Sequence, residues 1–329
     1  MNITVFGAGA WGTALAIAWA AQHKVVLWSR DIGHAEMMRK THENAALLPG
    51  ICLPDALLPE EDFARACVGI ELAVIATPVI GLRETVQALR QQAPHVPVLW
   101  VCKGFEANTG LLPHQVVLAE LGDLALCGAL TGPSFAQEVA RQQPTAVTFA
   151  AKDALWAEQI ARVLHTPRLR VYAHDDLVGA EVGGAVKNVL AIATGICDGL
   201  GLGLNARAAL MTRGLAEIAR LGLALGGRQE TFMGLAGVGD LILTCTGDLS
   251  RNRKVGLALA AGKTLPQILK ELGHVAEGVS TAREVDRLSK EMQVDMPISA
   301  AVSSVLDGRL DAQAAVELLL ARTPRPEFS

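Results

Sequence analysis

The residues best suited to chemistry begin with the run GAGAWG at positions 7–12, where Gly7, Gly9 and Gly12 have the spacing GxGxxG. The run follows the apolar segment ITVF and opens a helical pattern, WGTALAIAWAAQ. In that context the glycines allow a tight turn and bring backbone amide groups close to a pyrophosphate. The run therefore predicts a dinucleotide site; the alternative is a glycine-rich turn in another kind of α/β protein.

A lysine inside an apolar helix is the second candidate. Lys187 lies in GGAVKNVLA (183–191) among small and aliphatic residues, so its ammonium group needs a polar partner. At 100° per residue it shares a helix face with small residues such as Gly183, Gly184 and Ala191. Such a face either packs on another backbone while the lysine reaches an edge, or leaves room for a ligand. In the second case Lys187 would polarise a carbonyl group and give a proton to the alkoxide that forms.

Polar residues also follow several apolar runs directly. Lys103 comes after PVLWVC, and the segment TGPS at 131–134 comes after LALCGAL. Parallel sheets bind ligands beyond the carboxyl ends of their strands, although an ordinary turn explains each of these segments alone. Further on, Asp240 lies in a glycine-rich turn, and the run SRNRK covers 250–254. Guanidinium groups match phosphate geometry, and a solvated basic loop is the alternative.

The residues after the second apolar run bear on the cofactor. NAD-specific folds usually place an acid here, against the ribose 2′-hydroxyl. In this chain KVVLWS at 24–29 is followed by Arg30 and Asp31. Arg30 would bind a 2′-phosphate, or it is a solvated turn residue beside Asp31. The sequence therefore favours NADPH over NADH.

The elements that must position these residues indicate two domains. Short β-rich runs alternate with helical patterns in the first half, which predicts βαβ units and a parallel sheet. After about residue 177 the periodicity is mostly helical. We expect an α/β Rossmann-type doubly wound sheet over residues 1–178, followed by an all-helical domain over 179–329. If Lys187 faces a ligand, this second domain binds substrate and carries the catalytic lysine. The β-rich runs are at 3–7, 24–29, 72–77, 97–103 and 124–132, and two more that could extend the sheet are at 145–151 and 169–174.

Composition limits the functions of the chain. Its 329 residues are 51% hydrophobic and 4% aromatic, and the net charge is −4. Without a concentrated field of lysine and arginine, binding to nucleic acid or to a membrane surface is not expected. The six cysteines form no CxxC pair, so we expect no metal site and no disulfide framework. The sequence has no basic leader and no run of about 18 apolar residues, so we expect a cytoplasmic protein without a membrane span.

Six segments, taken in order, resemble the bacterial-type NAD(P)-dependent glycerol-3-phosphate dehydrogenases. They are GAGAWGTALA, KGFE before TGPSFAQEVA, GGAVKNVLAIATGICDGLGLGLNARAALMTRGLAE, FMGLAGVGDLILTCTGDLSRNRKVG and HVAEGVSTA. The resemblance covers nearly the whole chain, and the two long C-terminal segments are highly specific to the family. It implies the reversible reduction of dihydroxyacetone phosphate to sn-glycerol 3-phosphate by NADPH or NADH, for phospholipid synthesis. It also implies an active site between the two domains, and a homodimer.

The same resemblance implies roles for individual residues. Lys187 is the family's catalytic lysine, which accepts the proton in the oxidative direction, and Asp240 is the candidate that orients it. Ala10 stands where many members have serine, so we expect its cofactor contact through the backbone. The implied substrate-binding residues are Lys103, Gly132, Ser134, Lys187, Asp240, Ser250, Arg251 and Asn252. The implied cofactor-binding residues, beside the motif glycines, are Ala10, Trp11, Arg30, Lys103, Ala136, Arg251, Val275 and Glu277.

Two other functions are open from the residues themselves. The β-hydroxyacid dehydrogenases and ketopantoate reductases also join a Rossmann domain to a helical domain and use a helix lysine, but they lack LSRNRK in this context. A redox-sensing protein that binds NADPH without turnover would keep GAGAWG. It would have no need to hold Lys187, Asp240 and Arg251 together.

Overall fold

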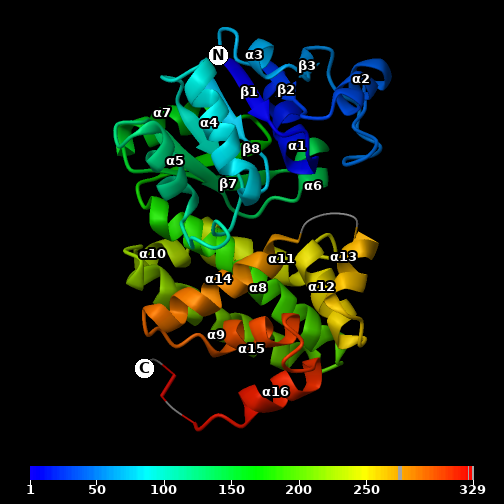
Figure 1. The fold of residues 1–329 in the computed structure, drawn as a ribbon, viewed down its shortest axis with the longest axis vertical. Coiled ribbons are helices and arrows are strands. Elements are labelled where there is room, and N and C mark those ends of the chain that lie inside the picture. Colours follow the sequence, from blue (N-terminus) through cyan, green and yellow to red (C-terminus); the bar gives the residue numbers. More distant parts are fainter. Residues whose placement is uncertain (273–275, 325, 328–329) are drawn as a thin grey trace.

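The chain has a sheet-containing part and a helical part (Figure 1). In the ribbon the strands gather with the N-terminal half, and the second half of the chain is helical throughout. The predicted fold class is confirmed. The computed structural model describes residues 1–272, 276–324 and 326–327.

A single sheet of eight strands forms the N-terminal part of the described chain, in the order β3-β2-β1-β4-β5-β6-β7-β8. Every neighbouring pair is parallel except β6 and β7. The chain order reverses between β1 and β4, and ligands of doubly wound sheets bind where the loops after such strands diverge. The strands are β1 (Asn2–Phe6), β2 (Lys24–Trp28), β3 (Leu57–Glu60), β4 (Leu72–Ile75), β5 (Val98–Trp100), β6 (Cys127–Thr131), β7 (Thr145–Ala151) and β8 (Leu169–His174).

Seven of these strands coincide with the β-rich runs of the sequence, and β3 is the one that was missed. Its sequence, LLPE, is short and contains a proline, which is tolerated because β3 lies at the sheet edge and pairs only with β2. The run 145–151 does extend the sheet, as β7, but antiparallel to its neighbour β6. The connection over 132–144 carries only the one-turn helix α6 (Ala136–Ala140), so it has no crossover helix and the chain turns back antiparallel to β6.

Both faces of the sheet are covered by apolar packing. Successive residues of β4 alternate between two buried clusters: Leu72 and Val74 lie in one, and Ala73 and Ile75 in the other. The flanking helices are α1 (Ala10–Trp19), α2 (Ile32–Thr41), α3 (Phe63–Ala66), α4 (Leu82–Gln92), α5 (Pro113–Leu121), α6 and α7 (Ala154–Leu164), with a 3₁₀ turn η1 at Val79–Gly81.

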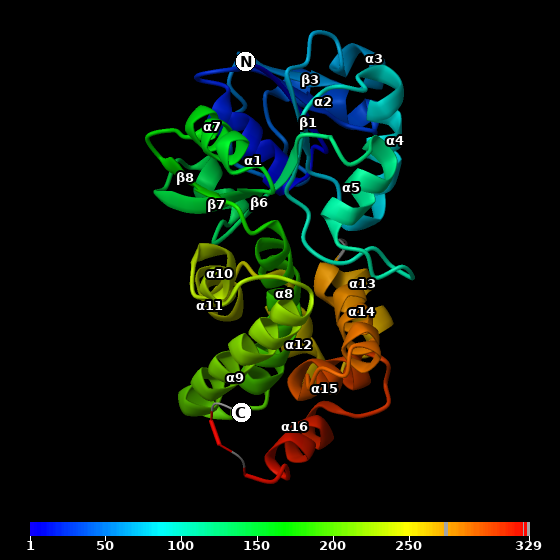
Figure 2. The same ribbon diagram turned by 90° about the vertical axis from the view of Figure 1, so that its left-hand side faces the viewer.

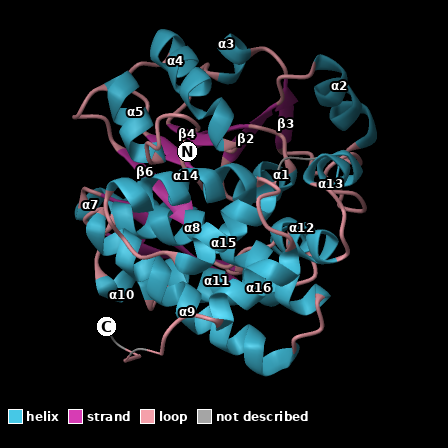
Figure 3. Cartoon of the chain, turned by 60° about the horizontal axis from the view of Figure 1, so that its bottom comes forward, coloured by secondary structure: helices cyan, strands magenta, loops and turns pink. Residues whose placement is uncertain are grey.

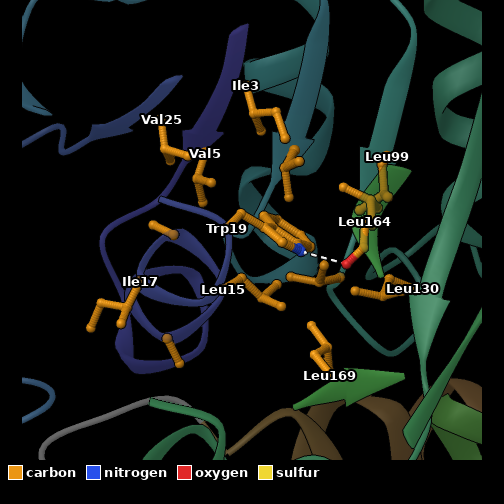
Figure 4. Close-up of a cluster of buried hydrophobic side chains, with 14 of the residues drawn as sticks. Ile3, Val5, Leu15, Ile17, Trp19, Val25, Leu99, Leu130, Leu164 and Leu169 are labelled. Atoms are coloured by element: carbon orange, nitrogen blue, oxygen red, sulfur yellow. Dashed lines mark hydrogen bonds between the residues drawn. The ribbon is translucent and has the colours of Figure 1, made fainter. Parts of the chain in front are cut away.

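Trp19 lies in the centre of the first of these clusters (Figure 4). It is fully buried beside Leu15 and Leu130, and its indole Nε1 donates a hydrogen bond of 3.0 Å to the carbonyl oxygen of Leu164. That bond joins α1 to the end of α7. The helix that follows the glycine-rich loop is therefore fixed by core packing and by a buried hydrogen bond.

The C-terminal part is built around α8 (Leu177–Gly199), which begins three residues after the last strand (Figures 2 and 3). This helix packs against α9, α11, α12 and α14, and residues around its whole circumference are buried. The other elements are α9 (Gly203–Ala224), α10 (Gln229–Phe232), a π-helical turn η2 (Leu235–Gly239), α11 (Asp240–Thr246), α12 (Arg251–Ala260), α13 (Leu265–Leu272), α14 (Glu277–Glu291), α15 (Pro297–Leu306) and α16 (Ala312–Leu320).

Helices α8 and α12 approach each other backbone to backbone. A Cβ atom added at Gly195 would lie 2.1 Å from the carbonyl oxygen of Arg253, and one at Gly256 would lie 2.1 Å from that of Ile192. The length and hydropathy of α8 are also those of a membrane-spanning helix, but 94% of its most apolar 18-residue stretch is buried inside the protein. The segment Gln229–Thr246 and α12, which are bent by 48° at the break between them, are together also long and apolar enough to span a membrane. In α8 these features belong to a core helix.

Gly195→Ala should lower the free energy of unfolding by about 1–3 kcal/mol, because the added methyl group meets the backbone of α12 and the helices must separate. Urea unfolding measures the change. Gly33→Ala in α2 is the control, since a Cβ there would lie 3.4 Å from Asp31 Oδ1, and it should be neutral or stabilising. A Gly195→Ala protein as stable as the parent would contradict the close packing.

Candidate functional site

The glycine-rich loop lies between β1 and α1, beside the end of β4. Gly7 has φ +125°, and a Cβ there would lie 2.7 Å from the backbone carbon of Ala76. A Cβ at Gly12 would lie 2.1 Å from the Gly7 carbonyl oxygen, so α1 turns back closely on the loop. At Gly9 an added Cβ would meet nothing within 4 Å. The loop therefore has the tight turn and the open side that a pyrophosphate requires.

Two further features fit a dinucleotide at this loop. No side chain caps α1, so the amide groups of its first turn, from Ala10 and Trp11, lack a side-chain acceptor. Thr77, which follows β4 and lies beside Gly7, has a buried hydroxyl with no hydrogen-bond partner among the described residues. A polar ligand would satisfy both kinds of group.

Two lysines from different parts of the fold meet at one carboxylate. Lys103 Nζ lies 2.7 Å from Asp240 Oδ2, and the ammonium group of Lys187 donates to Asp240 Oδ1. Asp240 has no exposed surface, and Lys187 is 6% exposed. The ammonium group of Lys187 thus finds its partner in the interior and does not reach a solvent edge.

Small residues on α8 allow this meeting. A Cβ at Gly183 would lie 2.4 Å from the Ala236 carbonyl oxygen, so η2 packs directly against α8 and starts α11 at Asp240. A Cβ at Gly184 would lie 2.8 Å from Thr131 Oγ1 and 3.5 Å from the side chain of Lys103. The small face around Lys187 therefore serves close approach by two neighbouring segments, and that approach brings the lysines together.

Burial lowers the pKa of Lys187 to about 8. The Asp240 carboxylate opposes that change, and the positive charge of Lys103 adds to it. An amine with a pKa this close to neutrality can both release and regain a proton under ordinary conditions. The arrangement suits proton exchange with a ligand bound beside Lys187 and Lys103.

Two polar residues of this region were missed by the sequence reasoning. Thr244 Oγ1 accepts a hydrogen bond of 2.9 Å from Lys187 Nζ and donates one of 2.7 Å to the Asp240 carbonyl oxygen. Asn188 Oδ1 accepts a bond of 2.9 Å from Asn252 Nδ2. The available signals were the four-residue spacing from Asp240 to Thr244 and the position of Asn188 next to Lys187.

The TGPS segment holds Lys103 from the sheet side. The Gly132 carbonyl oxygen accepts a bond of 3.3 Å from Lys103 Nζ and one of 2.9 Å from Ser134 Oγ. Gly132 and Ser134 are therefore placed next to Lys103. Ala136, the third predicted residue of this stretch, begins α6, which packs against α1.

The residues of the basic run SRNRK, at the start of α12, have different roles. Ser250 caps the helix by accepting a bond of 3.3 Å from the Arg253 amide, and Arg253 pairs with Asp198 at 2.7 Å. Asn252 Oδ1 accepts a bond of 3.1 Å from the Gly278 amide, which joins α12 to α14. Arg251 is exposed on the first turn. Arg253 is therefore the arginine of this run that forms a structural ion pair.

Glu277 is the first residue of α14 and lies near the charges of Lys103 and Lys187. Burial raises the pKa of its carboxyl group, and the positive charges of Arg251, Lys103 and Lys187 oppose that rise. We use the name charge cluster for Lys103, Lys187, Asp240, Arg251 and Glu277. Three positive and two negative groups, contributed by five segments, suit a ligand that brings additional negative charge.

Three other residues were predicted to bind the cofactor: Arg30, Trp11 and Val275. Arg30 is exposed directly after β2, and Trp11 is half-buried at the start of α1. Val275 lies outside the described residues. Within the part of the chain that the structure describes, no group of three or more His, Cys, Asp or Glu side chains could hold a metal ion.

Sequence comparison gives the same family over both parts of the chain. Residues 2–157 match the profile of the NAD-dependent glycerol-3-phosphate dehydrogenase N-terminus, and residues 176–317 match that of the C-terminus. A glycerol-3-phosphate dehydrogenase [NAD(P)+] from Dechloromonas aromatica is 67% identical over 329 residues, covering all of both chains.

Solved structures agree with this similarity. A glycerol-3-phosphate dehydrogenase from Coxiella burnetii is 40% identical, with a TM-score of 0.93 over 98% of this chain and 99% of that one. A ketopantoate reductase from Ralstonia eutropha is 14% identical, with a TM-score of 0.60 over 96% of this chain and 100% of that one. The second likeness concerns the fold alone.

Asp240→Asn should lower the free energy of unfolding by about 3–5 kcal/mol at neutral pH, because it leaves two ammonium groups buried side by side without a carboxylate. Urea unfolding measures the loss. The matched control is Asp248→Asn, whose carboxylate pairs with Arg253 at 3.0 Å but whose side chain is 96% exposed. That change should cost less than about 1 kcal/mol. Equal losses in the two variants would contradict the buried bridge.

Proposed function

The chain belongs to the NAD-dependent glycerol-3-phosphate dehydrogenase family, and on that premise we propose that the charge cluster is its active site. The enzyme is an oxidoreductase that reversibly reduces dihydroxyacetone phosphate to sn-glycerol 3-phosphate with NADPH or NADH, supplying glycerol phosphate for phospholipid synthesis. The observation that carries the assignment of the site is the Asp240 carboxylate, which is bonded to both Lys103 and Lys187.

Lys187 is the catalytic residue of the proposal. The nicotinamide ring, when bound, donates or accepts the hydride at the substrate carbon. Lys187 gives a proton to the carbonyl oxygen as charge collects there, and it takes the proton back in the oxidative direction. A donor held in place stabilises this charge more in the transition state than in the ground state. Its pKa of about 8 suits both directions, and Asp240 and Thr244 hold it in place.

The phosphate group of the substrate is assigned to the positive groups around Lys187. Lys103 and Arg251 supply the charge, and the first turn of α12 supplies amide donors, since an anion is favoured at a helix N-terminus. The other substrate contacts are assigned to residues beside these groups: Gly132, Ser134, Asp240, Ser250 and Asn252.

The cofactor is assigned to the glycine-rich loop and the carboxyl edge of the sheet. Arg30 follows β2, where the 2′ group of the adenosine ribose lies in Rossmann folds, so NADPH is favoured over NADH. The other proposed contacts come from the loop, from α6 and from α14: Gly7, Gly9, Ala10, Trp11, Gly12, Lys103, Ala136, Arg251 and Glu277. Val275 stays a prediction from the sequence.

The division into domains at residues 178 and 179 is part of the same proposal. It is supported by the change from β8 to α8 between His174 and Leu177. We assign the enzyme to the cytoplasm, as expected from its sequence.

Purified protein should oxidise NADPH when given dihydroxyacetone phosphate, as measured by absorbance at about 340 nm. With unphosphorylated dihydroxyacetone, kcat/KM should be lower by at least about 10²-fold, because two charged hydrogen bonds worth roughly 1.5–3 kcal/mol each are lost. Comparable values for the two ketones, or no turnover with either, would overturn the proposed function.

Lys187→Met should lower kcat by about 10² to 10⁴-fold, the range for loss of a general acid, and leave NADPH affinity intact. Methionine keeps an apolar chain of similar length, so the fold should survive. Lys254→Met removes an exposed lysine of α12 and should leave kcat unchanged. If the Lys187→Met protein keeps kcat within about tenfold of the parent and changes only its melting temperature, the lysine is a packing residue.

A homodimer is the proposed assembly. Its support is an apolar cavity of about 660 Å³ in the helical part, lined by α8, α9, α15 and α16, with the exposed Leu202 and Leu320 on its wall. Leu202 and Leu320 are 39% and 79% exposed, and exposed apolar surface is typical of an association site. Light scattering should give about twice the 34.6 kDa mass of the chain, and a monomer at micromolar concentration would contradict the assignment.

A further inference from the structure

Three polar side chains outside the charge cluster connect the end of β2 to the glycine-rich loop. Ser29 Oγ and His34 Nδ1 are 3.2 Å apart, and His34 Nε2 and Asn44 Oδ1 are 2.9 Å apart. Asn44 Nδ2 donates to the Ala8 carbonyl oxygen at 2.9 Å. Ser29 is 4% exposed and Asn44 is 1% exposed. We call these three residues the Ser29–His34–Asn44 chain.

The contact with Ala8 fixes the orientation of the Asn44 amide. A backbone carbonyl oxygen can only accept, so the atom of Asn44 that faces it is the nitrogen. The Oδ1 atom therefore faces His34, and it also accepts a bond of 3.3 Å from the Leu47 amide. Because Oδ1 has no proton to give, His34 Nε2 must carry one.

The hydroxyl of Ser29 then depends on the charge of His34. In the neutral ring Nδ1 is an acceptor, so Ser29 donates its proton to His34 and can only accept from other groups. It does accept a bond of 3.3 Å from the Asp31 amide. In the charged ring Nδ1 carries a proton and donates to the Ser29 oxygen. The hydroxyl proton of Ser29 is then available to another acceptor.

These two states match two different ligands. The 2′ group of the adenosine ribose lies beyond the second strand in Rossmann folds, and here that strand is followed by Ser29 and Arg30. The 2′-hydroxyl of NADH can donate to Ser29 while His34 is neutral. The 2′-phosphate of NADPH only accepts at neutral pH, so it requires Ser29 to donate.

We propose that His34 determines cofactor specificity by taking one proton from solvent when a 2′-phosphate binds, which turns Ser29 from an acceptor into a donor. The proposal rests on the NAD(P)-dependent function stated above and adds a residue and a proton to it. Asn44 connects the same event to the loop that binds the pyrophosphate, because it holds both His34 and Ala8.

Among the described residues, no carboxylate is bonded to the ring of His34. Arg30, at the end of β2, opposes a positive ring until a phosphate neutralises it, so proton uptake and phosphate binding favour each other. On α2, Glu36 is exposed, and Asp31 accepts from the His34 amide. The other nearby carboxylates are bonded elsewhere: Glu43 to the Gly50 amide, and Glu60 to Arg65 and two amides.

Counting protons during binding tests the proposal without relying on turnover. Titration calorimetry at about pH 8, where a phosphate monoester is fully ionised, is run in buffers of different ionisation enthalpy. The wild-type protein should take up more protons with NADPH than with NADH, by as much as about one per site.

His34→Gln is the decisive variant, because its amide can donate to Asn44 and accept from Ser29 like the neutral ring but cannot gain a proton. It should bind NADH within about twofold of the parent and bind NADPH about tenfold more weakly, as expected for one charged hydrogen bond. The difference in proton uptake between the cofactors should disappear. Equal weakening of both cofactors, or a difference that persists, would overturn the proposal.

Two further variants separate the possible failures. Ser29→Ala removes the hydroxyl group and should also abolish the difference in proton uptake between the cofactors. This variant takes the place of His34→Gln if the His34→Gln protein does not fold. Arg30→Ala should weaken NADPH by about tenfold or more while a difference in uptake remains, since the Ser29–His34–Asn44 chain is intact. If the wild-type protein bound neither cofactor, the proposed function itself would fail, which is a different result from binding without proton uptake.

Discussion

The rest of the site depends on one interaction, the buried carboxylate of Asp240 between two ammonium groups. Lys103 comes from the end of a strand in the sheet and Lys187 from the central helix, and both are bonded to Asp240. Without that carboxylate two positive charges would lie together in an interior that cannot solvate them. The carboxylate therefore allows two cations to be held together where a phosphorylated ketone and a developing alkoxide need them.

The bridge places demands on the backbone around it. Asp240 reaches Lys187 because η2 packs on α8 at Gly183, and Lys103 reaches the same point because its side chain passes beside Gly184. Side chains at these two positions would separate the segments that carry the charged groups. The small residues of α8 are thus part of the active-site architecture, although they contribute no functional group.

Much of this was predictable from the sequence, and the limits have physical reasons. The dinucleotide site at GAGAWG could be predicted from local sequence, because a strand, a tight turn and a helix follow one another within about twenty residues. Lys187 was recognisable because a charge within an apolar helix needs a partner, but the identity of the partner depends on a contact 53 residues away. The sequence showed Asp240 only as an acid in a glycine-rich turn, and periodicity could not pair it with Lys187.

Other features depended on tertiary contacts that no local pattern encodes. The strand β3 lies at the sheet edge and pairs with β2 alone among the described strands, so its short sequence with a proline gave no signal. Thr244 looks like an ordinary helix residue until the lysine bonded to it is known. In the run SRNRK, Arg253 and Arg251 have the same chemistry. Only the position of Asp198 reveals that Arg253 is used in a structural ion pair.

The most direct test of the bridge is an NMR titration of the lysine side-chain nitrogens in protein labelled with ¹⁵N-lysine. The Lys187 signal is assigned by its loss in Lys187→Met. Burial beside Lys103, opposed by Asp240, predicts that Lys187 titrates with a pKa of about 8. In Asp240→Asn the pKa of Lys187 should fall below that value, since the charge that favours its protonated form is gone. A Lys187 that titrates like an exposed lysine, near 10.5, or a pKa that is the same in both proteins, would contradict the account.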